Sequence, residues 1–225
     1  MSLIHSFKLV LAPPHPAGKP FLIGGAVVAV AGAVMPWTAA HVVAVLAVLF
    51  VLFCFYFFRD PERVPPVLPG SVVAPADGHI VSVERVAPPA ELDLGAEPRW
   101  RVAIFLSVLD VHVNRMPVAA TVLRAAYHKG QFVNASLDKA SDLNERNAIA
   151  IGLADGRTMA VVQIAGLIAR RILSQASEGR SFALGERFGI IRFGSRTDLY
   201  LPPDVEPLVR VGQTTIGGET ILARL

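Results

Sequence analysis

The dipeptide Gly194-Ser195 is the first feature of this sequence that suggests chemistry. It follows the strand-like run Ile190 to Phe193 and precedes Arg196. A serine hydroxyl becomes a nucleophile once a base takes its proton, and a preceding glycine leaves the adjoining carbonyl unobstructed. Gly-Ser is also a common turn, so the dipeptide alone indicates no activity. The G-x-S-x-G elbow of a serine hydrolase does not occur at this position, which argues against that class.

Three further polar residues lie in turn-like or strand-like segments. Asp77 is in the turn PADG, His112 opens the segment HVNRMP, and Arg146 is in NERN. Without further context, Asp77 reads as a turn residue. His112 likewise reads as a buried structural histidine and Arg146 as part of a polar turn.

The order of several short motifs resembles the phosphatidylserine decarboxylase family, particularly its short bacterial members. Two apolar segments are followed by FFRDPER, PADG, FLSVLDVHVNRMP, NERN, IAGLIARRI, GERFGIIRFGSR and YLP, which together cover nearly the whole chain. Each motif is weak alone, whereas the combination in this order is specific. The resemblance implies a precursor that cleaves itself at a Gly-Ser bond, matched here by Gly194-Ser195. The products would be chains 1–194 and 195–225, held together as a heterodimer.

The resemblance also implies a cofactor made from the chain itself. Attack of the Ser195 hydroxyl on the Gly194 carbonyl, then elimination and hydrolysis, would turn residue 195 into a pyruvoyl group and release ammonia. The pyruvoyl carbonyl would condense with the headgroup amine of phosphatidylserine and accept the electrons freed as carbon dioxide leaves. The product would be phosphatidylethanolamine. Neither a metal nor pyridoxal phosphate (PLP) is expected.

The family pattern assigns roles to the polar residues. Asp77 matches the aspartate of a P-x-D-G turn, and His112 matches the first histidine of H-x-x-H-x-P. Arg115 occupies the second histidine position, and arginine cannot act as a base near neutral pH. His112 is therefore the expected base and proton donor, in self-cleavage, decarboxylation or both. The alternative is that Asp77 acts in self-cleavage with less help. Arg115 is expected to hold a carboxylate, either Asp77 or the substrate's, and Arg146 to contact the substrate headgroup.

Short apolar runs predict the elements that position these residues. Strands are expected over 100–106, 119–126, 148–153 and 158–164, and on both sides of the turn at Asp77-Gly78. Ala165 to Leu173 is predicted to be a helix, and the tail from Pro207 to Leu222 a two-stranded closing element. We expect an α+β, β-rich fold in which residues 59–225 form a barrel-sandwich-like catalytic domain.

Residues 1–58 are predicted to form a membrane anchor of two apolar helices. Ala39 to Phe58 is long enough to cross the hydrocarbon core, and the turn PWT separates it from the shorter run Phe21 to Met35. A single span preceded by a re-entrant segment remains an alternative. Basic residues flank the two apolar helices on both sides, namely Lys8, Lys19, Arg59 and Arg63. They favour the cytoplasmic face of the inner membrane for both ends of the helix pair.

Composition limits the remaining classes. The 225-residue chain has a formal net charge of +3 and one cysteine, Cys54, so it forms no intramolecular disulfide. Its mild positive charge suits an anionic membrane surface, and no basic stripe indicates a nucleic-acid partner. The alternative is a membrane-anchored biotinyl or lipoyl carrier, because Asp77-Gly78 and the glycines near the C-terminus look like pieces of such a module. A homodimer is also left open.

Overall fold

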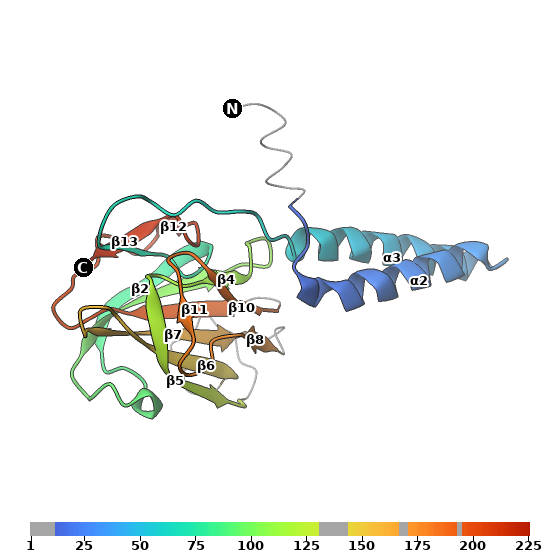
Figure 1. The fold of residues 1–225 in the computed structure, drawn as a ribbon. Coiled ribbons are helices and arrows are strands. Elements are labelled where there is room, and N and C mark those ends of the chain that lie inside the picture. Colours follow the sequence, from blue (N-terminus) through green and yellow to red (C-terminus); the bar gives the residue numbers. More distant parts are fainter. Residues whose placement is uncertain (1–11, 131–143, 167–170, 193–194) are drawn as a thin grey trace. The chain divides into compact units, whose positions relative to one another are not determined.

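The computed structural model describes residues 12–130, 144–166, 171–192 and 195–225, and the chain forms two compact units, Met1–Glu62 and Arg63–Leu225. The first unit contains the short helix η1 (Pro16–Gly18) and the helices α2 (Lys19–Val34) and α3 (Thr38–Phe57) (Figure 1). Two helical segments, Pro16–Val34 and Thr38–Phe57, are long and apolar enough to cross a membrane. Most of their apolar side chains are exposed, unlike those of a soluble core helix, so this unit fits membrane association.

Glycines allow α2 and α3 to approach each other closely. A Cβ atom on Gly25 would lie 2.6 Å from a methyl carbon of Val51, and one on Gly32 would lie 2.6 Å from the carbonyl oxygen of Ala40. Small residues at such contacts let two helices pack in an apolar solvent that gives them no hydrophobic driving force. The two helices therefore form a packed hairpin.

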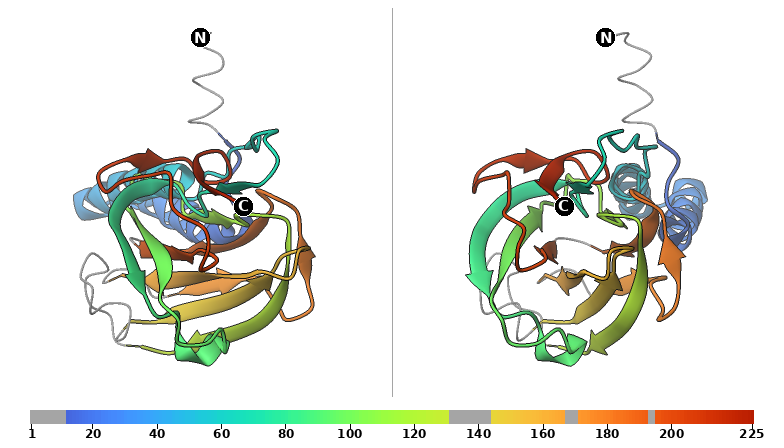
Figure 2. Two further views of the ribbon diagram at one scale, coloured as in Figure 1. Left: turned by 90° about the vertical axis from the view of Figure 1, so that its left-hand side faces the viewer. Right: turned by 60° about the vertical axis from the view of Figure 1, so that its left-hand side comes forward.

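The second unit is built from antiparallel strands in three sheets. The largest sheet has the order β12-β2-β3-β11-β7-β6-β5-β9, a second has β4-β10-β8, and a third pairs β1 with β13. Figure 2 shows the long strands β2 and β5 curving around the interior of this unit. The strand bounds are β1 Ser71–Val73, β2 Gly78–Val86, β3 Arg99–Leu106, β4 Val113–Arg115, β5 Ala120–His128, β6 Arg146–Gly152, β7 Thr158–Ala165, β8 Ile172–Ser174, β9 Ser181–Phe182, β10 Arg187–Ile191, β11 Ser195–Tyr200, β12 Thr214–Thr215 and β13 Ile221–Arg224.

Apolar side chains fill the space between the sheets and also cover part of the outer face. The main core cluster includes Ile104, Met116 and Leu199, all with no exposed surface. A second cluster on the opposite face of the large sheet includes Tyr200 and Leu92, which belongs to the short helix η2 (Ala90–Leu92). Because β11 contributes to both clusters, its side chains are buried on both faces.

The strand-rich α+β class with two apolar N-terminal helices is confirmed, while some local predictions are wrong. Ala165 ends strand β7 and Leu173 lies in β8, so the helix expected over Ala165 to Leu173 is not formed at its two ends. The strands on either side of Asp77 do not pair with each other, because β1 pairs with β13 and β2 with β3. In the described part of the chain, the large sheet ends at β12 and β9.

Candidate active site

Ser195 begins the central strand β11 and is completely buried. Its cross-strand partners are Leu106 on β3 and Ala165 on β7. Side chains alternate along a strand, so Ser195 shares its face with Leu199 of the main core cluster. Among the described residues, Ser195 Oγ has no hydrogen-bond partner. A buried hydroxyl without a partner is uncommon and calls for an explanation. Gly194, the other residue of the predicted cleavage site, lies outside the described residues.

His112 immediately precedes β4 and has no exposed surface. Its Nδ1 lies 2.9 Å from the carbonyl oxygen of Asp110, and its own carbonyl oxygen accepts the N–H of Ile191 at 3.2 Å. A carbonyl oxygen only accepts hydrogen bonds, so Nδ1 carries the proton in the neutral ring. The lone pair is then on Nε2, which is the form that a general base requires. The contact with Ile191 places His112 beside the segment that leads to Ser195.

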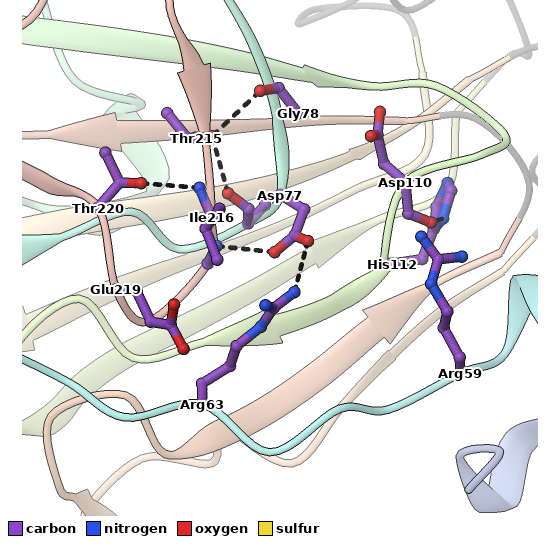
Figure 3. Close-up of polar contacts among 12 residues, drawn as sticks. Arg59, Arg63, Asp77, Gly78, Asp110, His112, Thr215, Ile216, Glu219 and Thr220 are labelled. Carbon is purple, nitrogen blue, oxygen red and sulfur yellow. Dashed lines mark hydrogen bonds and ion pairs between the residues drawn. The ribbon is translucent and has the colours of Figure 1, made fainter. Parts of the chain in front are cut away.

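Asp77 lies in the turn between β1 and β2, where its carboxylate is held on both sides (Figure 3). Oδ2 accepts a hydrogen bond from Arg63 Nη2 at 2.7 Å, and Oδ1 accepts the N–H of Gly217 at 2.7 Å. Gly78 has φ +147°, and a Cβ atom there would lie 2.2 Å from the carbonyl oxygen of Phe105. Glycine is therefore required after Asp77. The partner Arg63 was not predicted as a site residue.

Arg115 lies in β4 with 3% of its surface exposed. Its Nη1 donates to the carbonyl oxygen of Gly185 at 3.1 Å, and its backbone N–H donates to Pro75, in the Asp77 turn, at 2.8 Å. A Cβ atom on Gly218 would approach Arg115 Cδ to 2.9 Å. Arg115 and Asp77 therefore contact the same glycine turn, Arg115 through Gly218 and Asp77 through Gly217.

The sheet register brings the Asp77 turn close to residue 195. His79 pairs with Phe105, which in turn pairs with Arg196 on β11. Two strand spacings separate the start of β2 from Ser195, a distance of about 10 Å between backbones. The structure therefore gathers Ser195, His112 and the Asp77 turn in one region of the second unit.

Arg146 lies apart from these residues. It pairs with Ile164, which pairs with Arg196, so Arg146 is on the opposite face of the large sheet from Ser195. Its guanidinium contacts Glu91 Oε1 through Nη2 at 2.9 Å and through Nε at 3.0 Å. Both residues line a polar pocket of about 300 Å³ on that face. Arg146, which was predicted to contact the substrate headgroup, therefore does not lie on the same face of the sheet as Ser195.

The same outer face carries an ionic network, buried except at Glu84, that the sequence did not reveal. Arg196 Nε and Nη2 contact the two carboxylate oxygens of Asp198 at 2.7 and 2.8 Å, and Arg101 bridges Asp198 and Glu84. Burial, with Asp198 nearby, raises the pKa of Tyr200 to about 12. These contacts hold β11 in place immediately after Ser195. The charges can be buried there because they are paired and hydrogen-bonded.

Among the described residues, no group of three or more His, Cys, Asp or Glu side chains is placed to hold a metal ion.

A model of the family described as phosphatidylserine decarboxylase matches residues 50–223. Proteins named phosphatidylserine decarboxylase proenzyme from Gluconacetobacter diazotrophicus and Gluconobacter oxydans are 68% and 59% identical, with both chains covered completely.

A third relative of the same name, from Granulibacter bethesdensis, is 65% identical over all of this chain and 91% of its own. These matches do not favour the carrier alternative. The chain belongs to the phosphatidylserine decarboxylase family.

Proposed function

We propose that this chain is a precursor that cuts itself between Gly194 and Ser195 and then decarboxylates phosphatidylserine to phosphatidylethanolamine. The observation that carries the proposal is the buried hydroxyl of Ser195, which has no partner among the described residues and stands at the start of the central strand. A side chain placed this way is poorly explained as a structural serine, because burying an unpaired hydroxyl costs stability.

The processing step balances with residues of the chain and one water. Ser195 Oγ would attack the Gly194 carbonyl carbon as a base takes its proton, and the acyl group would pass from nitrogen to oxygen. Loss of the Ser195 Hα and departure of the Gly194 carboxylate would leave dehydroalanine at position 195. Water would then replace its nitrogen as ammonia, leaving a pyruvoyl group. That group supplies the electron-accepting carbonyl for the decarboxylation.

His112 is the proposed base in this step and the proposed proton donor in decarboxylation. Its support is the tautomer set by the Asp110 carbonyl, which puts the basic lone pair of the neutral ring on Nε2. Asp77 contributes a fixed negative charge beside the site, oriented by Arg63 and Gly217. Arg115 is proposed to stabilise the Asp77 turn or to hold the substrate carboxylate, because its side chain lies against Gly218 and its backbone N–H donates to the Pro75 carbonyl oxygen. No PLP or metal takes part in this scheme.

The two units are proposed to divide anchoring from chemistry. Residues 1–58 would hold the protein in the inner membrane, with the catalytic domain, residues 59–225, on the cytoplasmic face next to its lipid substrate. The exposed apolar surface of α2 and α3 supports this role. We also propose a barrel-sandwich arrangement of the catalytic domain, supported by the core cluster that its sheets share. Chains 1–194 and 195–225 would stay together as a heterodimer.

Intact mass and a denaturing gel of the purified protein test the proposal. The wild type should run as two pieces, and the smaller should begin at residue 195 with a blocked, pyruvoyl-bearing end. Ser195→Ala removes the attacking oxygen and should remain a single chain without decarboxylase activity. Ser195→Ala that still splits at this bond, or an active wild type that is a single chain, would overturn the assignment.

A further inference from the structure

A chain of four hydrogen-bonded side chains crosses the interior of the catalytic domain. Asn147 Nδ2 donates to Gln163 Oε1 at 2.9 Å, and Gln163 Nε2 donates to Asn114 Oδ1 at 2.7 Å. Asn114 Nδ2 then donates to Thr197 Oγ1 at 3.3 Å. Asn147 is 6% exposed and the other three have no exposed surface. We call these four residues the amide chain.

The register shows that the amide chain joins two sheets. Asn147 and Thr197 both pair directly with Gln163, so the three form a row across β6, β7 and β11. Asn114 comes from β4 in the smaller sheet and bridges Gln163 to Thr197. Its pairing partner on β10 is Gly189, where a Cβ atom would lie 2.9 Å from Gln163 Nε2. A glycine at this position therefore leaves space for the buried amide.

The end of the amide chain lies next to the candidate catalytic residues. Thr197 is two residues after Ser195 on β11, and Asn114 is two residues after His112. Ser195 and Thr197 share one face of β11, because side chains alternate along a strand, and His112 directly precedes β4, the strand that carries Asn114. The hydrogen bond between Asn114 and Thr197 therefore ties the segment that carries His112 to the strand that carries Ser195.

We propose that the amide chain is a positioning device that holds His112 in register with residue 195. The inference rests on the proposed function, because it assumes that His112 and residue 195 react together. Ser195 Oγ has no hydrogen bond among the described residues, so its placement depends on how β11 is held. Apolar contacts between the sheets tolerate sliding, whereas directional hydrogen bonds between buried amides fix one register. Thr197 and Gln163 are thus positioning residues that act through their neighbours.

Matched substitutions of threonine test this role. Thr197→Val keeps the volume of the side chain but removes the acceptor for Asn114, whereas Thr197→Ser keeps the hydroxyl. Thr158→Val is the control, because Thr158 starts β7, far from Gln163, and its hydroxyl contacts only Arg99 among the contacts described. For each full-length variant, the rate of self-cleavage, kcat and KM for phosphatidylserine in mixed micelles, and the melting temperature would be measured.

Thr197→Val should slow self-cleavage and lower kcat by about 10- to 100-fold, the usual effect of misplacing reacting groups by up to an ångström. KM should change less than about twofold, because the amide chain positions the reacting groups and does not bind the substrate. Thr197→Ser should stay within about threefold of wild type for both rates. Gln163→Met interrupts the hydrogen bonds of the amide chain without altering β11. If Thr197→Val fails to fold, Gln163→Met should show the same loss of self-cleavage rate and kcat.

The possible failures are distinguishable. Suppose that the wild type is cut, and that Thr197→Val and Gln163→Met cleave themselves and decarboxylate phosphatidylserine at wild-type rates. The amide chain then does not position the site. If Thr158→Val shows the same loss of rate at the same loss of melting temperature, the effect is one of stability and the inference is wrong. A wild type that is never cut would instead refute the proposed function.

Discussion

Replacing Asp77 with asparagine separates the charge of this side chain from its shape. An asparagine oxygen can still accept the N–H of Gly217, but it cannot form the ion pair with Arg63 at 2.7 Å. The two side chains are 16% and 10% exposed, between a surface pair and a fully buried pair. Surface pairs contribute up to ~1 kcal/mol, and removing one partner of a buried pair costs ~3–5 kcal/mol. We expect Asp77→Asn to lower the free energy of unfolding by about 2 kcal/mol, or the Tm by about 4–8 °C.

Arg63→Gln is the matched control, because it breaks the same ion pair from the other side. If the Asp77 charge takes part in self-cleavage, Asp77→Asn should remain uncut for hours while Arg63→Gln, with a similar Tm, is still processed. A time course on denaturing gels, alongside a thermal melt of each variant, makes the comparison. Wild-type cleavage of Asp77→Asn would reduce Asp77 to a turn residue. Equal failure of both variants would show that the ion pair acts only by stabilising the turn.

Three further predictions concern the base, the anchor and a buried phenol. His112→Ala should slow self-cleavage and carbon dioxide release at least ~100-fold, and normal values for both activities would exclude His112. Arg115→His, which places a histidine at the second position of H-x-x-H-x-P, should still be cut. Deleting residues 1–58 should release the catalytic domain from membranes in a flotation assay and leave self-cleavage intact, and a folded but uncut truncation would show that the anchor contributes to the site. Because burial raises the pKa of Tyr200 to about 12, the folded phenol keeps a proton that the unfolded one loses near pH ~10. The free energy of unfolding should therefore fall by ~2–3 kcal/mol between pH 10 and 12, and Tyr200→Phe should remove this part of the slope; an identical slope in both proteins would contradict it.

The sequence predicted the strands better than the helix of the catalytic domain. The runs at 100–106 and 158–164 correspond to β3 and β7 within one residue at each end, because β-branched and apolar residues in short runs are typical of buried strands. The helix predicted over Ala165 to Leu173 was wrong at both ends, because a short apolar run has no periodicity that separates a buried strand from a helix. Residues 167–170 of this prediction lie outside the described residues. Local pattern also could not reveal that β1 pairs with β13, since that pairing joins distant segments.

The sequence predicted candidate residues for the site but not their geometry. Motif order singled out Ser195, His112 and Asp77, which the structure places in one region. The face occupied by Arg146 depends on strand register, and a shift of one residue would reverse it. Likewise, Asn114 and Thr197 are 83 residues apart in sequence and meet only because two sheets pack together. A single sequence carries no direct signal for such a contact.

The strands that follow residue 195 are interleaved with those that precede it. β11 lies between β3 and β7, β12 pairs with β2, and β13 pairs with β1. Before a cut at this position, unfolding and refolding would be unimolecular and independent of concentration. After it, an unfolded molecule would consist of two separate chains, and recovery would require a second-order encounter that dilution slows. The mature enzyme would therefore depend on slow unfolding, that is on kinetic stability, for its lifetime.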